Sequence, residues 1–250
     1  MIFTYSGTGN SEYAARALLD EGEALISIPR AVREGRWVWH CAEGERVGFV
    51  FPVYFFGLPA TVLDFVRRVR FSGPVSYVYA VITCGAGIGG AGEKLRAALS
   101  VRGIRLDAVF PLTMPDNYVV LYDVTTPAEE GPILAAAGAR LTEIGACIRE
   151  KRPAGFPVSA AARARTALVY PLYDLRRGTA KFWSDDSCVG CGVCARRCPV
   201  QAIRLVDGRP EWVAPRCDHC MACLRCNAVQ YGKRTVGKYR YKHPSLRKEG

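Results

Sequence analysis

Residues 1–19 read MIFTYSGTGNSEYAARALL, a short apolar run followed by a glycine-containing turn and a helix-like segment. Residues 1–5 are rich in strand-forming side chains, and residues 11–19 carry apolar side chains at helical spacing. The turn between them, Ser6–Ser11, consists of glycines, hydroxyl-bearing residues and one asparagine. A strand that leads through such a turn into a helix is the unit from which helix-covered parallel sheets are built.

The alternation of strands and helices continues to about residue 150. Further strands are expected at 25–28, 47–51, 75–83 and 109–114, and further helices at 59–69, 90–99 and 127–150. Residues 47–51 are nearly all apolar, as expected of a strand that is covered on both faces. The pattern predicts an α/β fold with a doubly wound, five-stranded parallel sheet.

The composition is that of a globular chain without a membrane segment. The 250 residues are 50% hydrophobic and 23% charged, and every long apolar stretch is interrupted by prolines, glycines or charges. The N-terminus lacks a basic region followed by an apolar one, so no secretory signal is expected. We therefore expect a cytoplasmic protein, in a reducing compartment where disulfides are rare.

Eight of the eleven cysteines lie between Cys188 and Cys226, in two runs of similar spacing. The first run has the form C-x2-C-x2-C-x3-C-P, which is typical of iron–sulfur proteins. In two-cluster ferredoxins the fourth cysteine of such a run binds the other cluster. The spacing therefore predicts two [4Fe–4S] clusters, one held by Cys188, Cys191, Cys194 and Cys226, the other by Cys217, Cys220, Cys223 and Cys198.

Two alternatives stay open for these cysteines. Structural zinc also uses four cysteines, although usually as two separated C-x2-C pairs. The second run also departs from the usual spacing, because Cys226 follows Cys223 after only two residues and precedes Asn227 instead of a proline. The cluster that Cys226 completes is therefore expected to be either a [4Fe–4S] or a [3Fe–4S] cluster.

The turn Ser6–Ser11 has the composition of a phosphate-binding loop. Its backbone N–H groups and hydroxyls can surround a phosphate at the N-terminus of the following helix. It lacks the lysine of a P-loop, so it suits a monophosphate that is held by neutral donors. The alternative is an ordinary strand–helix turn with a good N-cap.

Together with the cysteine runs, this turn makes the chain resemble the flavodoxin–ferredoxin fusion proteins of anaerobic bacteria and archaea. The resemblance includes Pro52–Pro59, Thr83–Gly85 and Met114–Tyr118, which follow predicted strands, and the C-terminal Tyr231–Thr235 and Tyr241–Pro244. It implies a flavodoxin-like FMN domain with strand order 2-1-3-4-5. It also implies a small α+β ferredoxin-like domain that holds two [4Fe–4S] clusters.

The expected FMN site lies beyond the carboxyl ends of the strands, where open parallel sheets bind their ligands. Tyr54, Phe55 and Phe56 can supply a flat apolar wall for the flavin ring, unless the phenylalanines belong to the core. No catalytic residue is predicted. The residues expected to contact FMN are Ser6, Gly7, Thr8, Gly9, Asn10, Ser11, Pro52, Val53, Tyr54, Phe55, Phe56, Gly57, Thr83, Cys84, Gly85, Ala86, Gly87, Gly90 and Asn117.

The stretch Gly85–Gly90 also satisfies G-x-G-x-x-G, the dinucleotide-binding fingerprint. That fingerprint belongs in the first strand–helix turn of a fold, whereas this stretch follows the fourth predicted strand. We interpret it as a loop that lines the flavin ring. His219, which lies between two predicted cluster ligands, is expected to tune a cluster or to face solvent.

The chain divides into four predicted segments. Residues 1–150 form the FMN-binding domain, 151–186 a basic connector with a short helix near 172–177, 187–232 the two-cluster domain, and 233–250 a basic extended arm. The net charge of +11 is concentrated in the connector and the arm. This charge favours acidic redox proteins as partners. No nucleic-acid motif accompanies it, and the oligomeric state is left open.

These features favour an electron-transfer flavo-iron–sulfur protein that passes single electrons between two [4Fe–4S] clusters and FMN. One alternative is an FMN-dependent reductase of a small molecule, fed by the clusters. A second alternative is a zinc-bearing nucleic-acid-binding protein, suggested only by the positive charge.

Overall fold

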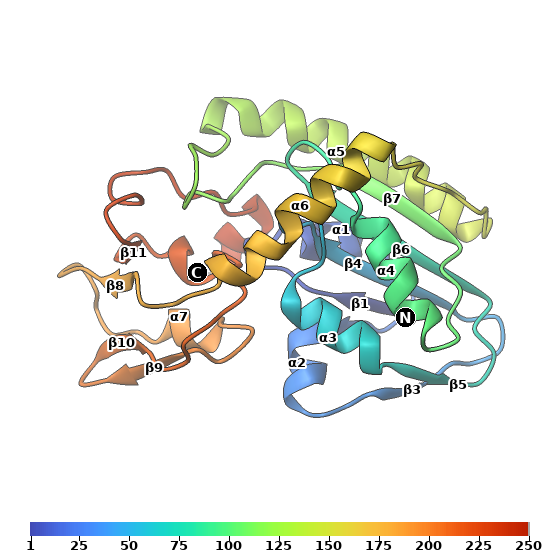
Figure 1. Ribbon diagram of the computed structural model, residues 1–250, viewed down its shortest axis with the longest axis horizontal. Coiled ribbons are helices and arrows are strands. Elements are labelled where there is room, and N and C mark those ends of the chain that lie inside the picture. The colour runs from blue at the N-terminus through green and yellow to red at the C-terminus, as the bar shows by residue number, and fades with distance from the viewer. Residues whose placement is uncertain (250) are drawn as a thin grey trace.

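The computed structural model describes residues 1–249. The chain forms a helix-covered sheet from its N-terminal half and a smaller unit of short strands and turns from its C-terminal part (Figure 1). The two units lie side by side, and the carboxyl ends of the central strands face the smaller unit.

Five parallel strands form the main sheet, as predicted. They are β1 (Ile2–Thr4), β2 (Leu25–Ser27), β4 (Arg46–Pro52), β6 (Tyr77–Cys84) and β7 (Ala108–Thr113), in the order β2-β1-β4-β6-β7. All eight residues of β6 are buried, because both faces of the sheet are covered.

Helices cover both faces of this sheet (Figure 1). Phe3 and Phe49 pack on one face with α2 (Ile28–Arg33), α3 (Ala60–Arg68) and α4 (Ala91–Ser100). Ile2 and Val50, their neighbours in sequence, pack on the opposite face with α1 (Asn10–Leu18) and α5 (Pro127–Arg149). This alternation is the period-two pattern of a strand that is buried on both sides.

A second, small parallel sheet was not predicted. It pairs β3 (Val38–His40) with β5 (Arg70–Ser72). Each strand has only three residues, which is too short for a periodic signal. Trp39 is buried in this sheet and packs edge-to-face on Phe3, with ring centroids 5.1 Å apart, so the small sheet extends the core.

The predicted short helix near 172–177 is wrong in extent, because the structure has α6 over Ala160–Arg176. Pro171, which suggested a break, lies inside this helix. The tertiary contacts of α6 offset the hydrogen bond that a proline removes: Thr166 and Tyr173 are buried, and Thr166 Oγ1 accepts a 2.9 Å hydrogen bond from the N–H of Gly90. In Figure 1 α6 runs diagonally from the sheet unit to the smaller unit.

The smaller unit contains two antiparallel strand pairs. β9 (Ile203–Val206) pairs with β10 (Arg209–Trp212), and β8 (Phe182–Ser184) pairs with β11 (Val229–Tyr231). A short helix, α7 (Val193–Arg196), and two 3₁₀ turns, η1 (Cys223–Arg225) and η2 (Pro244–Glu249), complete it. The predicted arm is not simply extended, because its end turns as η2. Gly250 lies outside the described residues, and so do the side chains of Arg247 and Lys248, which contributed to the predicted basic arm.

Candidate functional site

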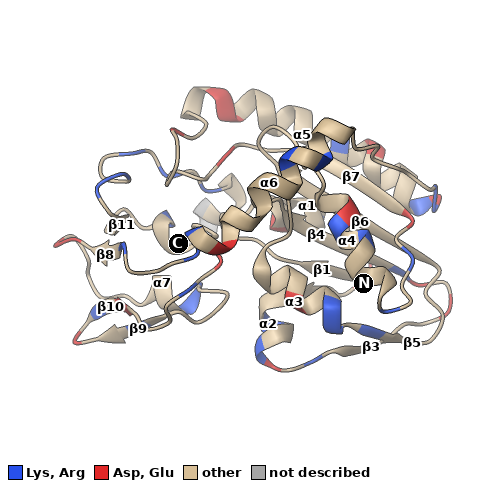
Figure 2. Ribbon diagram, viewed as in Figure 1, with Lys and Arg blue, Asp and Glu red and all other residues tan. Residues whose placement is uncertain are grey.

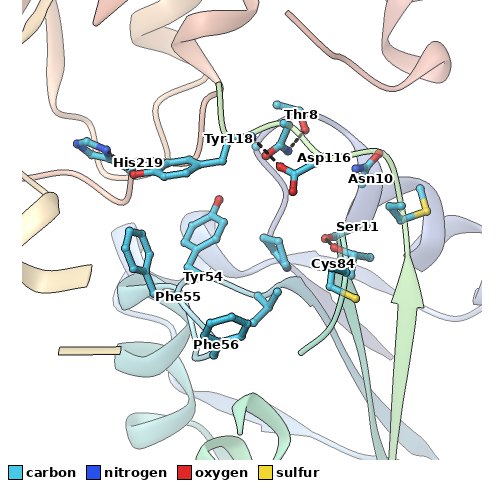
Figure 3. A pocket seen from close by; sticks show the side chains of 18 of the residues that line it. Thr8, Asn10, Ser11, Tyr54, Phe55, Phe56, Cys84, Asp116, Tyr118 and His219 are labelled. Atoms are coloured by element: carbon cyan, nitrogen blue, oxygen red, sulfur yellow. Dashed lines mark hydrogen bonds between the residues drawn. The ribbon is translucent and has the colours of Figure 1, made fainter. Parts of the chain in front are cut away.

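A cavity of about 360 Å³ lies where the carboxyl ends of β1, β4, β6 and β7 face the smaller unit. Figure 3 shows Tyr54, Phe55 and Phe56 on one side of it and the polar Thr8, Asn10 and Ser11 on another. All of the residues expected to contact FMN line this cavity except Gly9, Gly57 and Gly90. The sheet topology therefore brings the predicted loops together at one place, and their binding of FMN stays a prediction.

The three exceptions serve packing. A Cβ on Gly9 would lie 2.5 Å from Leu246, and a Cβ on Gly57 would lie 2.2 Å from the ring of Tyr170. The N–H of Gly90 is bound by Thr166. Each of these glycines permits a close approach of another segment to a loop that borders the cavity.

The turn Ser6–Ser11 opens α1 and is held by its own side chains. Ser6 Oγ accepts a 3.1 Å hydrogen bond from the N–H of Gly9, which has φ 102° and precedes the first helical residue. Ser11 Oγ and Thr83 Oγ1 lie 2.8 Å apart, and Asn10 Nδ2 donates to the carbonyl of Pro115. Small donors and the positive end of a helix thus meet at one corner of the cavity, which fits a phosphate.

The aromatic wall is a tight turn in an unusual backbone conformation. Tyr54 and Gly57 exchange backbone hydrogen bonds of 3.0 and 2.8 Å, and the two residues between them, Phe55 and Phe56, have φ values of 50° and 63°. Bulky residues rarely adopt positive φ, and such strain concentrates at functional sites. The turn places both phenyl rings, half-buried, at the cavity.

Seven of the eight clustered cysteines fall into two groups of neighbours. Cys198, Cys217, Cys220 and Cys223 line one small cavity. The pKa of Cys217 is raised to about 12, mainly by burial and with a contribution from neighbouring Cys198. In the other group, burial raises the pKa of Cys194, with contributions from Cys188 and Cys226. These neighbours are the ones that the crossed ligand rule requires.

The donor chemistry of both groups fits iron–sulfur clusters. All of the cysteines are free thiols. Two sulfur atoms already accept backbone hydrogen bonds, Cys198 Sγ from the N–H of Ala202 at 3.2 Å and Cys217 Sγ from the N–H of His219 at 3.4 Å. Hydrogen bonds of this kind stabilise cluster thiolates and tune their potential. Within residues 1–249, no three His, Cys, Asp or Glu side chains gather tightly enough to hold a single metal ion.

Asp218 joins the two units and was missed by sequence reasoning. Its fully buried carboxylate accepts hydrogen bonds from Tyr5 Oη at 2.9 Å and from the N–H of Thr61 at 3.3 Å, and Arg177 lies 3.5 Å from its other oxygen. Burial raises the pKa of Tyr5, and the charge of Asp218 raises it further, so Tyr5 stays a donor. The segment between Cys217 and Cys220 is therefore fixed against the start of the main sheet.

Gly7 makes this contact closer still. A Cβ there would lie 1.9 Å from the carbonyl oxygen of Cys220, so only glycine allows the two backbones to meet. The predicted phosphate loop and a predicted cluster ligand are thus in direct backbone contact.

His219 lies between the two cavities, since it lines both of them, as does Asp218. Its Nε2 lies 3.0 Å from the carbonyl of Gly178, which can only accept, so Nε2 carries the proton and Nδ1 accepts from Tyr118 Oη at 3.3 Å. Burial lowers the pKa of His219, which favours this neutral form. Figure 3 shows Tyr118 and His219 side by side above the cavity.

The C-terminal segment returns to the predicted phosphate loop. The N–H of His243 donates to the carbonyl of Thr8 at 2.8 Å, and Tyr241 Oη donates to Asn10 Oδ1 at 2.7 Å. The ring of His243 stacks on Tyr13, with centroids 4.3 Å apart. The segment therefore braces the predicted phosphate loop from behind.

Comparison with known proteins identifies one domain. Residues 181–204 match the family model described as a 4Fe-4S binding domain, which supports a 4Fe–4S cluster and a role in iron–sulfur electron transfer. No curated protein matches the chain. Among solved structures, the Trp repressor binding protein from Bacillus subtilis is similar, with 14% sequence identity and a TM-score of 0.35 over 57% of this chain and 95% of that chain. In residues 1–249, no helix has the length and apolar character that a membrane span requires.

Proposed function

We propose that this protein is an electron carrier in which two iron–sulfur clusters exchange single electrons with a bound FMN. The observation that carries the proposal is the shared wall between the two cavities. Asp218 and His219 line the large cavity at the strand ends and also the small cavity of Cys198, Cys217, Cys220 and Cys223. A redox group in each cavity would be separated by two residues of one loop.

The lining of the large cavity suits FMN. Ser6, Thr8 and Ser11 offer neutral donors at the N-terminus of α1, which suits a monophosphate. The strained turn of Phe55 and Phe56 offers apolar surface for a flat ring. When bound, FMN supplies a centre that accepts one or two electrons, and this chain supplies its position and surroundings.

The residues between the two cavities keep the cavities at a fixed distance from each other. The hydrogen bonds from Tyr5 and Thr61 to Asp218 and the backbone contact between Gly7 and Cys220 prevent the cluster loop from moving away. The neutral, doubly hydrogen-bonded ring of His219 fills the remaining wall. This fixed separation, made of buried polar side chains that are all hydrogen-bonded, suits electron transfer without proton movement.

Anaerobic purification followed by measurement of iron, sulfide, zinc and flavin tests the proposal. We expect about eight irons per chain, from two four-iron clusters, and one FMN. A zinc-containing chain without flavin would refute it. Steady turnover of a small molecule by the loaded protein would instead favour the reductase alternative.

A further inference from the structure

A second large cavity, about 720 Å³ and open to solvent, lies beside the predicted cluster loop. It is lined by the end of α6 and the segment leading to β8, by the end of β11 and the turn that follows it, and by Tyr118, Val120 and Leu121 of the loop after β7. We name it the basic groove, because four of its lining residues are Arg176, Lys181, Lys233 and Arg234. Figure 2 shows lysine and arginine along the loop that follows β11.

The charge of the basic groove is uncompensated. None of its lining residues is acidic. Arg176, Lys181, Lys233 and Arg234 are exposed, and among the described ion pairs none of them contacts a carboxylate. By contrast, the neighbouring Arg177 pairs with Asp174 and Asp218. Four free cations on one concave surface attract an anionic partner.

The groove is lined by apolar side chains as well as by basic ones. Leu175, which is 75% exposed, and the half-buried Tyr231 both line it. Exposed apolar side chains among basic ones are typical of a protein interface, whereas a site for a small anion has no use for that apolar surface.

The groove lies close to the loop that begins at Cys217. The N–H of Cys217 donates to the carbonyl of Arg177 at 2.9 Å, and His219 is bound to the carbonyl of Gly178, which lines the groove. The rings of Tyr231 and His219 lie 5.2 Å apart. A protein seated in the groove would thus lie one layer of residues from the loop that carries Cys217 and Cys220.

We propose that the basic groove docks an acidic one-electron carrier protein and brings it next to the cluster site of Cys198, Cys217, Cys220 and Cys223. This inference rests on the proposed function. A cluster held by these four thiolates would accept one electron from the carrier, so that the carrier would be oxidised and the cluster reduced. No bond forms or breaks and no proton moves. The reverse direction uses the same contact.

The test reverses the charge of two exposed basic residues that line the groove. The variant carries Lys233→Glu and Arg234→Glu, and the matched control carries Arg70→Glu and Arg96→Glu, which change the net charge equally on the sheet unit. Binding of an acidic two-cluster ferredoxin is measured by calorimetry at about 50 and about 300 mM NaCl. We expect the groove variant to bind at least about tenfold more weakly, with a smaller salt dependence, and the control to bind like the wild type.

Three results would overturn the inference. The first is an equal affinity of the groove variant and the control for the ferredoxin, and the second is ferredoxin binding that is independent of salt. The third is that the groove variant loses binding of a pyridine dinucleotide while it keeps binding of the ferredoxin. Lys233→Gln with Arg234→Gln should give an intermediate affinity, and thermal unfolding confirms that each variant is folded. Chemical reduction of the bound flavin and iron should stay unchanged in the groove variant. A chain without flavin or iron would refute the proposed function separately, because binding of the ferredoxin is measured without electron transfer.

Discussion

Replacing Gly7 by alanine tests the contact between the predicted phosphate loop and the predicted cluster loop. The new Cβ would lie 1.9 Å from the carbonyl oxygen of Cys220 and 2.9 Å from its carbonyl carbon. Real Cβ atoms do not approach other atoms closer than 3.0 Å, so the two backbones must separate by about the difference. Overpacking of this kind costs about 1–3 kcal/mol, and here neither side is a flexible side chain.

The displacement acts on a predicted cluster ligand, so it has three readouts. Urea unfolding should show the loss of about 1–3 kcal/mol, and iron analysis should show fewer irons per chain because Cys220 moves. Reduction of the flavin through the clusters should slow, because Cys220 moves relative to the large cavity. Gly155→Ala is the matched control, because nothing lies within 4 Å of a Cβ at that position. If Gly7→Ala behaves like Gly155→Ala in all three measurements, the two loops do not meet as described.

Three further predictions concern single side chains. Tyr241→Phe removes the hydrogen bond to Asn10 and should weaken FMN binding about fivefold to tenfold in a fluorescence titration, whereas an unchanged affinity would mean that the C-terminal segment does not brace the loop. Burial raises the pKa of Cys84 from 9.0 to about 11, so above pH 9 the folded chain keeps a proton that the unfolded chain releases. The contribution of Cys84 to the free energy of unfolding is therefore fully present below pH 9, and it falls by up to about 2 kcal/mol as the pH rises to 11. Cys84→Ala should flatten that part of the pH profile, and an unaltered slope would exclude Cys84 as its cause. Cys226→Ala should remove between about one and about four irons per chain, whereas Cys147→Ala should remove none; equal iron contents would show that Cys226 is not a ligand.

The five main strands could be predicted from the sequence because each is a short apolar run that ends in glycine, proline or small polar residues. The loops at their carboxyl ends follow from the same pattern, because parallel strands share one edge. This is why nearly all of the expected FMN-contacting residues line a single cavity.

The elements that sequence reasoning missed depend on tertiary contacts. The helix α6 continues past Pro171 because Thr166 and Tyr173 are held by the rest of the chain, which no local propensity encodes. The position of Asp218 depends on Tyr5, which lies 213 residues away in sequence. The basic groove combines side chains from α6, the segment before β8 and the turn after β11, so the sequence indicated the charge but not its concave arrangement.

The most direct test of the central claim is flavin reduction by a reduced acidic ferredoxin, followed by anaerobic stopped-flow absorbance. Two variants each lose one predicted cluster ligand: Cys217→Ala affects the set that shares a wall with the large cavity, and Cys191→Ala affects the other set. The account predicts that Cys217→Ala abolishes flavin reduction by the ferredoxin while light-driven chemical reduction of the same flavin persists, and that Cys191→Ala retains reduction by the ferredoxin. Equal rates in the wild type and in Cys217→Ala would contradict it.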